Sequence, residues 1–200
     1  MLVFASIRHN LTRLFRFSGR DGPRLFWPYA LCVYGMSTIV AVALAAPAFL
    51  MVFTRMQAFA RAHPDQASVA EGPGDYSITV HGVHPELMPD FTGFFNVIAA
   101  YACVLIVILA AAVSRRLHDR GRSALWGLTP LPFLVFAFFA FSRLLGALRT
   151  SNFSLRTFLL LFANNGLYLV VMALLLLQLV LPTKPVSNRF GPPGDLTPLW

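Results

Sequence analysis

The chain has 200 residues, of which 57 % are hydrophobic and only 12 % charged, and its formal net charge is +8. A soluble domain usually has about a quarter charged residues, and a disordered chain lacks this apolar content. The composition therefore excludes both classes and predicts an integral membrane protein. Membrane orientation accounts for the positive charge, so we expect no nucleic-acid partner in spite of the basic composition.

Residues 1–26 form a basic segment ahead of the first long apolar stretch. Within 1–18, apolar and basic side chains fall on opposite sides of a helical pattern. The apolar side is Val3, Phe4, Ile7, Leu11, Leu14 and Phe15, and the polar side is Arg8, Thr12, Arg13, Arg16 and Arg20. We predict an amphipathic helix over 1–18 that lies in the headgroup layer, and a solvated leader without fixed structure is the alternative.

Four uncharged stretches follow, and each is long enough for one helix to cross a bilayer core, which takes about 20 residues. They contain 30, 24, 20 and 27 residues, and none is long enough for two crossings and a turn. Backbone polar groups in lipid must be paired internally, so the stretches must be helical. We predict an all-α membrane domain over 27–181, with transmembrane helices near 27–53, 93–113, 124–142 and 158–181.

Two features inside these spans need an explanation. Pro28 fits a first helical turn, whereas Pro47 predicts a kink or the outer end of the first span. Asn164, Asn165 and Gly166 lie at some depth in the fourth span. We favour hydrogen bonding and close packing between helices for these three residues, and a polar path through the membrane is the alternative.

The one long external loop spans 55–92 and is rich in glycine, proline and acidic residues. Residues 76–80 alternate between apolar and polar side chains, which predicts a short strand or a hairpin arm. His81, His84, Glu86 and Asp90 match no strong zinc-binding spacing. We therefore predict a solvated loop, and we expect neither a metal site nor a cofactor.

The distribution of arginine and lysine predicts the orientation. If the N-terminus is cytoplasmic, 11 of the 16 basic residues lie inside and 5 outside, whereas five of the eight acidic residues lie outside. Basic residues accumulate on the cytoplasmic side of membrane proteins. We therefore predict that the N-terminus and the tail over 182–200 are both cytoplasmic.

The most informative polar segment joins the second and third spans. It contains Arg115, Arg116, His118, Asp119 and Arg122, which we predict to lie in a short turn at the membrane surface. Arginine binds phosphate through two parallel hydrogen bonds, so anionic lipid headgroups are candidate ligands. Asp119 either pairs with a neighbouring arginine or holds the imidazole of His118.

Two further polar segments share that face, and the three segments look like parts of one site or one folded cap. The motif residues in them are Phe17, Gly19, Arg20, Phe26 and Trp27, then Arg115, Arg116, Leu117, His118, Asp119, Arg122, Ser123 and Trp126, then Asn188, Arg189, Phe190, Gly191 and Pro192. In these motifs and in their order the chain resembles the bacterial inner-membrane family called domain of unknown function 805, the YhaH-like proteins. The resemblance implies a multi-pass protein of the bacterial inner membrane and assigns no biochemical role.

The chain departs from that family at one place within the motifs. Members usually have an arginine and a glutamate before the aromatic–tryptophan pair, whereas this chain has Pro23, Arg24 and Leu25 there. A carboxylate that would pair with the loop arginines is therefore absent from that position. The external loop, 55–92, also lies outside the resemblance.

Three function classes remain open. We favour a non-enzymatic structural or regulatory protein whose inner-face motifs bind anionic headgroups or a membrane partner, including a second copy of the chain, with His118 and Asp119 tying the terminal segments together. A small transporter or channel subunit would use Asn164 and Asn165, although no span contains a carboxylate or lysine. An enzyme acting on lipid phosphates would use His118 as base or nucleophile beside Asp119.

Overall fold

The computed structural model describes residues 2–82, 84, 87, 92–149 and 153–193. Its elements in chain order are α1 (Leu2–Thr12), α2 (Pro23–Ala62), β1 (Ala67–Gly72), β2 (Asp75–Val80), α3 (Thr92–Asp119), the 3-10 helix η2 (Ala124–Leu128), α4 (Leu131–Arg149) and α5 (Leu155–Val180). Four stretches are long and apolar enough to cross a membrane: α2, α3, η2 together with α4, and α5. The chain is therefore an all-α membrane protein with one small hairpin among its described residues.

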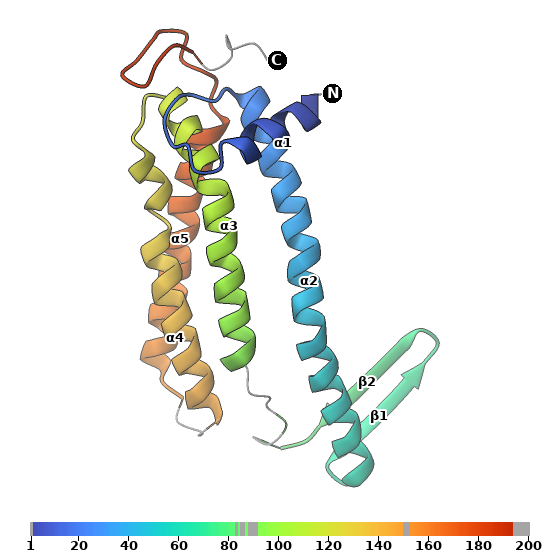
Figure 1. Cartoon of the computed structure of the whole chain (residues 1–200). Coiled ribbons are helices and arrows are strands. Elements are labelled where there is room, and N and C mark those ends of the chain that lie inside the picture. The colour runs from blue at the N-terminus through green and yellow to red at the C-terminus, as the bar shows by residue number, and fades with distance from the viewer. Residues whose placement is uncertain (1, 83, 85–86, 88–91, 150–152, 194–200) are drawn as a thin grey trace.

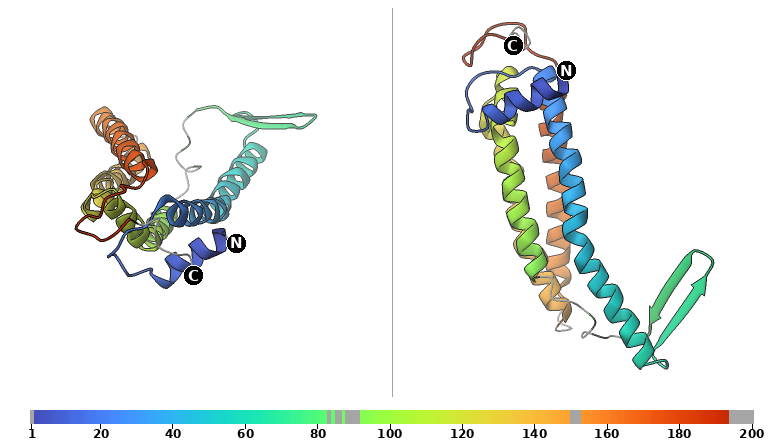
Figure 2. Two further views of the ribbon diagram at one scale, coloured as in Figure 1. Left: turned by 90° about the horizontal axis from the view of Figure 1, so that it is seen from above. Right: turned by 45° about the vertical axis from the view of Figure 1, so that its right-hand side comes forward.

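The long helices form two unequal groups. α3, α4 and α5 run side by side, whereas α2 packs mainly against α3, near one end, and then tilts away from the others (Figures 1 and 2). β1 and β2 form an antiparallel hairpin beyond the far end of α2, with Ala67 opposite Val80 and Gly72 opposite Asp75. We call this the hairpin end. The opposite end, where α1 crosses α2, is the cap end.

The hairpin confirms the strand predicted from the alternation over 76–80. Close by, the His84 imidazole contacts the His81 carbonyl at 2.9 Å and packs against the Phe59 ring. Glu86 and Asp90 lie outside the described residues. Within the part of the chain that is described, no three potential ligands gather to hold a metal ion.

α1 docks on α2 through two small polar residues and leaves most of its apolar side chains exposed. Ser6 and Asn10, one helical turn apart, are 0 % and 1 % exposed, whereas Val3, Phe4 and Leu11 remain on the surface. The predicted helix over 1–18 is therefore too long, because α1 ends at Thr12. The chain leaves the helix there, and the next carbonyls turn inward to accept hydrogen bonds, as described below.

The Ser6 hydroxyl of α1 hydrogen-bonds to two backbone groups of α2 near Pro28. It donates to the Leu25 carbonyl at 2.6 Å and accepts from the Tyr29 N–H at 3.1 Å. Asn10 donates to the same Leu25 carbonyl at 2.9 Å. Pro28 is interior to α2, not in its first turn as predicted, and a proline at such a position disturbs the helical hydrogen bonds around it. α1 thus pairs the backbone groups beside the disturbance.

α2 is longer at both ends than the span predicted over 27–53. It begins at Pro23, where a missing N–H costs nothing, and continues through Pro47 to Ala62. Pro47 therefore does not end the helix. Forty residues extend about 60 Å, roughly twice the thickness of the hydrocarbon core, so α2 projects beyond the membrane and supports the hairpin.

The second and third predicted spans also end elsewhere. α3 continues past residue 113 to Asp119, so the Arg115–Asp119 motif lies in the last turns of a helix and not in an interhelical turn. The span predicted over 124–142 divides into η2 and α4, and α4 runs on to Arg149. Pro130 and Pro132 have no N–H to continue a helix from η2, which explains the break. The predicted span 158–181 lies within a few residues of α5.

The largest buried cluster ties three helices together near the cap end. Phe26 and Tyr29 of α2 pack there with Leu117 of α3 and Leu179 of α5. The Tyr29 hydroxyl donates to the Ile108 carbonyl at 2.9 Å, which adds a hydrogen bond between α2 and α3. The cap end is therefore the best packed part of the helical bundle.

Asn164 hydrogen-bonds between helices, as we predicted for the polar residues of the fourth span. Its side-chain amide donates to the Phe133 carbonyl of α4 at 3.1 Å, and the residue is buried. Asn165 is exposed, and a side chain at Gly166 would meet open space within this chain. Close packing at Gly166 is therefore not seen between the described helices.

Asn164→Ala should lower the free energy of unfolding, because it removes the hydrogen bond between α4 and α5. Interhelical hydrogen bonds in membranes contribute about 0.6 kcal/mol on average and at most about 1.7 kcal/mol. Unfolding by denaturing detergent, followed by circular dichroism, measures the change. Asn165→Ala is the matched control and should leave the midpoint unchanged; equal effects of both variants would contradict the assignment.

Candidate functional site

The three polar segments come together at the cap end around two buried aspartates. We call this region the cap: the loop over 13–22, the end of α3 over 114–121 and the tail over 182–191. Arg20, Arg115, Arg116, His118 and Asp119 are all buried in it, with exposed fractions from 0 % to 8 %. Burying a guanidinium group is costly unless its donors are paired, so the contacts of these arginines decide how the cap is built.

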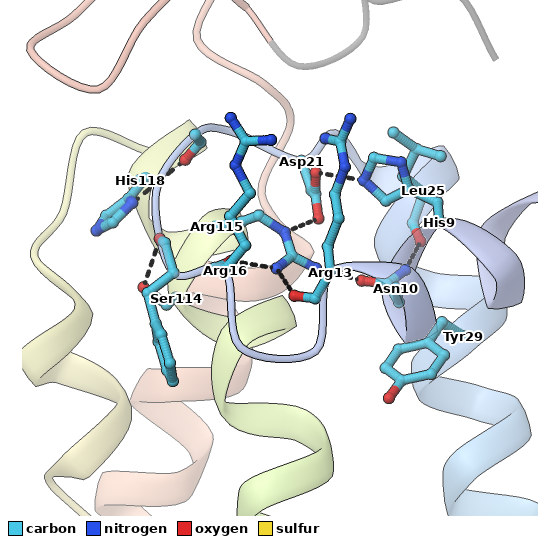
Figure 3. A network of polar contacts seen from close by, with 12 residues as sticks. His9, Asn10, Arg13, Arg16, Asp21, Leu25, Tyr29, Ser114, Arg115 and His118 are labelled. Carbon is cyan, nitrogen blue, oxygen red and sulfur yellow. Dashed lines mark hydrogen bonds and ion pairs between the residues drawn. The ribbon is translucent and has the colours of Figure 1, made fainter. Parts of the chain in front are cut away.

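Arg115 binds the N-terminal segment from below (Figure 3). Its Nε donates to Asp21 Oδ2 at 2.5 Å, and a terminal nitrogen donates to Asn10 Oδ1 at 2.7 Å. The other terminal nitrogen donates to the carbonyls of Arg13 and Arg16 at 2.9 Å and 2.5 Å. One side chain of α3 therefore holds both α1 and the loop that follows it.

Asp21 is the carboxylate that balances Arg115. Its second oxygen, Oδ1, lies 3.0 Å from His9 Nε2, which donates because a carboxylate only accepts. Burial alone raises the pKa of Asp21, but the His9 hydrogen bond and the charge and hydrogen bond of Arg115 outweigh it, so the pKa is held below its ordinary value of 3.8. Asp21 therefore stays ionised at neutral pH.

Arg20 holds the C-terminal tail to the end of α3. Its guanidinium donates five hydrogen bonds, to Asp119 Oδ1 at 3.1 Å, to the Asp119 carbonyl at 3.2 Å, and to three carbonyls of the tail. Those tail carbonyls belong to Lys184, Val186 and Gly191. The N-terminal loop, the central motif and the tail thus meet at one side chain.

Arg116 completes the second cluster and caps α5. One nitrogen donates to Asp119 Oδ2 at 2.6 Å, Nε donates to the Leu179 carbonyl at 2.9 Å, and the remaining nitrogen reaches the Leu181 carbonyl. The last carbonyls of a helix have no partner within it, and a cation there also interacts favourably with the helix dipole. Arg116 therefore forms an ion pair with Asp119 and also pairs the free carbonyls at the end of α5.

His118 and Asp119 do not contact each other through their side chains in the way an acid–base pair would. His118 Nδ1 lies 3.2 Å from the Gly19 carbonyl, and its ring stacks on Phe190 with centroids 3.8 Å apart. The Asn188 amide donates to the His118 carbonyl at 3.0 Å. Of the two alternatives left open for Asp119, the structure has the pairing with arginine.

Two glycines turn the backbone of the cap so that their carbonyls face inward. Gly19 and Gly191 have φ values of +97° and +123°, a region that side chains with a Cβ rarely adopt. The carbonyl of Gly19 accepts from His118, and that of Gly191 accepts from Arg20. Each turn therefore aims a carbonyl inward at a motif side chain.

The remaining motif residues lie at the edge of the cap. Arg122 and Arg189 are exposed, each over an aromatic ring, at 5.5 Å from the Trp126 centroid and 4.7 Å from the Phe190 centroid. Trp27 packs beside Phe26 against the buried cluster and makes no polar contact with the cap. The predicted arginines thus divide into a buried group and an exposed group, a division that spacing did not indicate.

Sequence reasoning missed four residues of the site: Ser6, His9, Asn10 and Asp21. A signal for Asp21 was present, because only three acidic residues were assigned to the inner face among eleven basic ones. Asp21 and Asp119 are two of these three, and both are buried against arginine. Asp21 also supplies the carboxylate for Arg115, whereas Pro23, Arg24 and Leu25 after it supply none.

Asp21→Asn should lower the thermal unfolding midpoint of the detergent-solubilised protein at pH 7, because it leaves Arg115 buried without its counter-ion. Breaking a buried pair costs about 3–5 kcal/mol. The stabilisation from a depressed pKa is present above the unfolded-state pKa and is lost as the pH falls through the folded value. The difference from wild type should therefore be full at pH 7 and shrink below pH 3.8. Asp65→Asn, at an exposed acid, should show no difference at pH 7.

Arg20→Gln should release the tail, because glutamine cannot reproduce five hydrogen bonds from a planar fork. Limited trypsin digestion followed by mass spectrometry should show cleavage after Arg189 at least several-fold faster than in wild type. Arg24→Gln removes an exposed arginine four residues away and should leave this rate unchanged. Equal rates in wild type and Arg20→Gln would show that other contacts hold the tail.

Comparison with known proteins gives a family and no function. Neither the curated proteins nor the solved structures include a match to this chain. The family model described as "Protein of unknown function (DUF805)" matches residues 14–192, which include all four spans and the whole cap except residue 13. The chain therefore belongs to the DUF805 family.

Proposed function

We propose that this chain is a non-enzymatic structural or regulatory protein of the bacterial inner membrane, with the cap end in the cytoplasm, where its exposed cationic side chains bind anionic lipid headgroups. The observation that carries the proposal is the separation of charge at the cap end. Both described acids there, Asp21 and Asp119, are buried at 1 % and 0 % exposure. The arginines buried with them use protein acceptors and are not free to bind a headgroup.

The exposed charge at the cap end is positive throughout the described residues. Seven cationic side chains are exposed there: Arg8, Arg13, Arg16, Arg24, Arg122, Lys184 and Arg189. The hairpin end exposes both signs, including Arg55 and Arg61 together with Asp65, Glu71 and Asp75. A basic residue near an anionic membrane surface is attracted by about 1 kcal/mol, so seven unopposed cations favour a lipid ligand. The same asymmetry supports the cytoplasmic orientation.

α1 has the side chains that an interfacial helix needs. Phe4 of α1 is 74 % exposed and Arg8 is exposed beside it, and in the loop that follows, Phe15 is 77 % exposed and Arg16 is exposed. Apolar side chains enter the acyl boundary while arginines contact phosphate. Since α1 is held to α2 by Ser6 and Asn10, its exposed residues are presented to the membrane surface in a fixed position.

The enzyme hypothesis receives less support from the geometry. A general base must be oriented toward its substrate, and the second residue of the candidate pair would have to hold it. Here the carboxylate oxygens of Asp119 accept from Arg20 and Arg116, and His118 faces Gly19 and Phe190. Both residues have structural partners that explain their burial.

Neutralising exposed cations at the cap end should reduce the protein's preference for anionic lipid. We would compare wild type with Arg8→Gln/Arg16→Gln, and with Arg55→Gln/Arg61→Gln as the control at the hairpin end. Each protein is reconstituted in vesicles of phosphatidylcholine and phosphatidylglycerol, re-extracted, and analysed for retained lipid. The cap variant should retain several-fold less phosphatidylglycerol, and high salt should reduce the wild-type preference because exposed charges are screened.

The outcomes separate the hypotheses. If wild type and the cap variant retained phosphatidylglycerol and phosphatidylcholine in the same ratio, headgroup binding by these cations would be overturned. A chemically altered phospholipid that depends on His118 would overturn the non-enzymatic assignment. If the control variant at the hairpin end also lost the preference for phosphatidylglycerol, the total charge of the protein would explain the binding and the cap end would not.

A further inference from the structure

An apolar pocket lies directly beneath the cap, between α3, α4 and α5. Its volume is about 400 Å³, within the range of about 300–1,000 Å³ found for ligand sites. Leu109 and Ala110 of α3, Leu134 of α4 and Met172 of α5 line its walls, and η2 and Phe17 lie at its cap end. Ser114, one of two polar side chains in the lining, already donates to the Phe17 carbonyl.

The pocket reaches the surface that lipid would contact. Ile106 of α3 and Leu134 of α4 both line it, and they are 37 % and 38 % exposed. From Leu105 to Ser114 the lining covers ten residues of helix, which span about 13 Å. One leaflet of a hydrocarbon core about 30 Å thick has a depth of about 15 Å, so the pocket matches the depth of one leaflet.

Size and charge indicate the occupant. A pocket of about 400 Å³ with an almost wholly apolar lining suits a slender hydrocarbon chain. At the cap end, Leu125 of η2 lines the pocket and is exposed, and the exposed Arg122, three residues earlier, lies over the ring of the neighbouring Trp126. A cation at the rim of an apolar pocket complements a ligand with an anionic head and a hydrocarbon tail.

We propose that this pocket binds one acyl chain of an anionic phospholipid from the leaflet at the cap end, with the phosphate beside Arg122. The inference deepens the proposed function and rests on it, because it assigns one headgroup to a defined site. The bound acyl chain packs against α3, α4 and η2 together. This lipid therefore joins the end of α3, which holds the cap, to the α4–α5 pair.

A photoreactive lipid tests the site in the full-length chain. Phosphatidylglycerol with a diazirine on one acyl chain is mixed into phosphatidylcholine vesicles that contain the protein, irradiated, and the crosslinked residues are mapped. Crosslinks should concentrate at lining residues such as Ile106, Ala110, Leu134 and Met172, and unlabelled phosphatidylglycerol should compete. The same label on phosphatidylcholine should crosslink several-fold less.

A larger side chain in the pocket should exclude the acyl chain of the lipid. Ala110→Phe should reduce crosslinking at the other lining residues at least fivefold, and the smaller Ala110→Leu should give an intermediate reduction. Ala173→Phe is the control, because Ala173 is exposed at similar depth on α5 and does not line the pocket. Arg122→Gln should remove the preference for phosphatidylglycerol and keep crosslinking within the pocket.

Each contrary result has a definite meaning. Crosslinks spread evenly over α2–α5, or unchanged by Ala110→Phe, would overturn the pocket while leaving headgroup binding by the other exposed cations standing. An unchanged preference in Arg122→Gln would overturn the assignment of the phosphate. A hydrophobic peptide crosslinked at the lining residues in place of lipid would assign the pocket to a partner helix and overturn the proposal.

Discussion

The structure depends on the burial of arginine side chains at the end of α3. A guanidinium group has five N–H donors and cannot lose its charge, so each one placed away from water needs several acceptors and a counter-ion. A single helix cannot supply them. Arg115 obtains its acceptors from α1 and the following loop, and Arg116 obtains them from Asp119 and the end of α5. The folding of both terminal segments follows from this requirement.

The same requirement divides the basic residues into two functional groups. Arg20, Arg115 and Arg116 have hydrogen-bond partners within the protein, and two aspartates offset two of their three charges. No exposed acid remains among the described residues at that end, so the exposed arginines face the surroundings unopposed. Lipid binding is therefore expected beside the most distinctive motif and not at its buried side chains. We propose that the pocket beneath η2 holds the acyl chain of one such lipid.

Sequence reasoning was successful where one-dimensional signals sufficed. Uncharged stretches located four spans because a helix in lipid needs about 20 apolar residues, and alternation located β2. It was less successful at the ends of helices. The helix ends depended on partners distant in sequence: α3 continues through Arg115 because that side chain is paired with Asp21, ninety-four residues away. The end of α1 at Thr12 has the same origin.

The sequence by itself determined the class of protein, the number of spans, the uneven distribution of charge and the membership of three motifs in one family. These are properties of composition, spacing and order, which can be evaluated along the chain without knowing which segments meet in space. Only the tertiary structure decided which charges are buried. Whether an arginine faces an aspartate or a phosphate depends on which segments meet in space, and here Arg20 meets the tail while Arg122 lies exposed over the Trp126 ring. Desolvation makes that difference large, because a buried guanidinium must be paired within the protein and an exposed one remains free to bind.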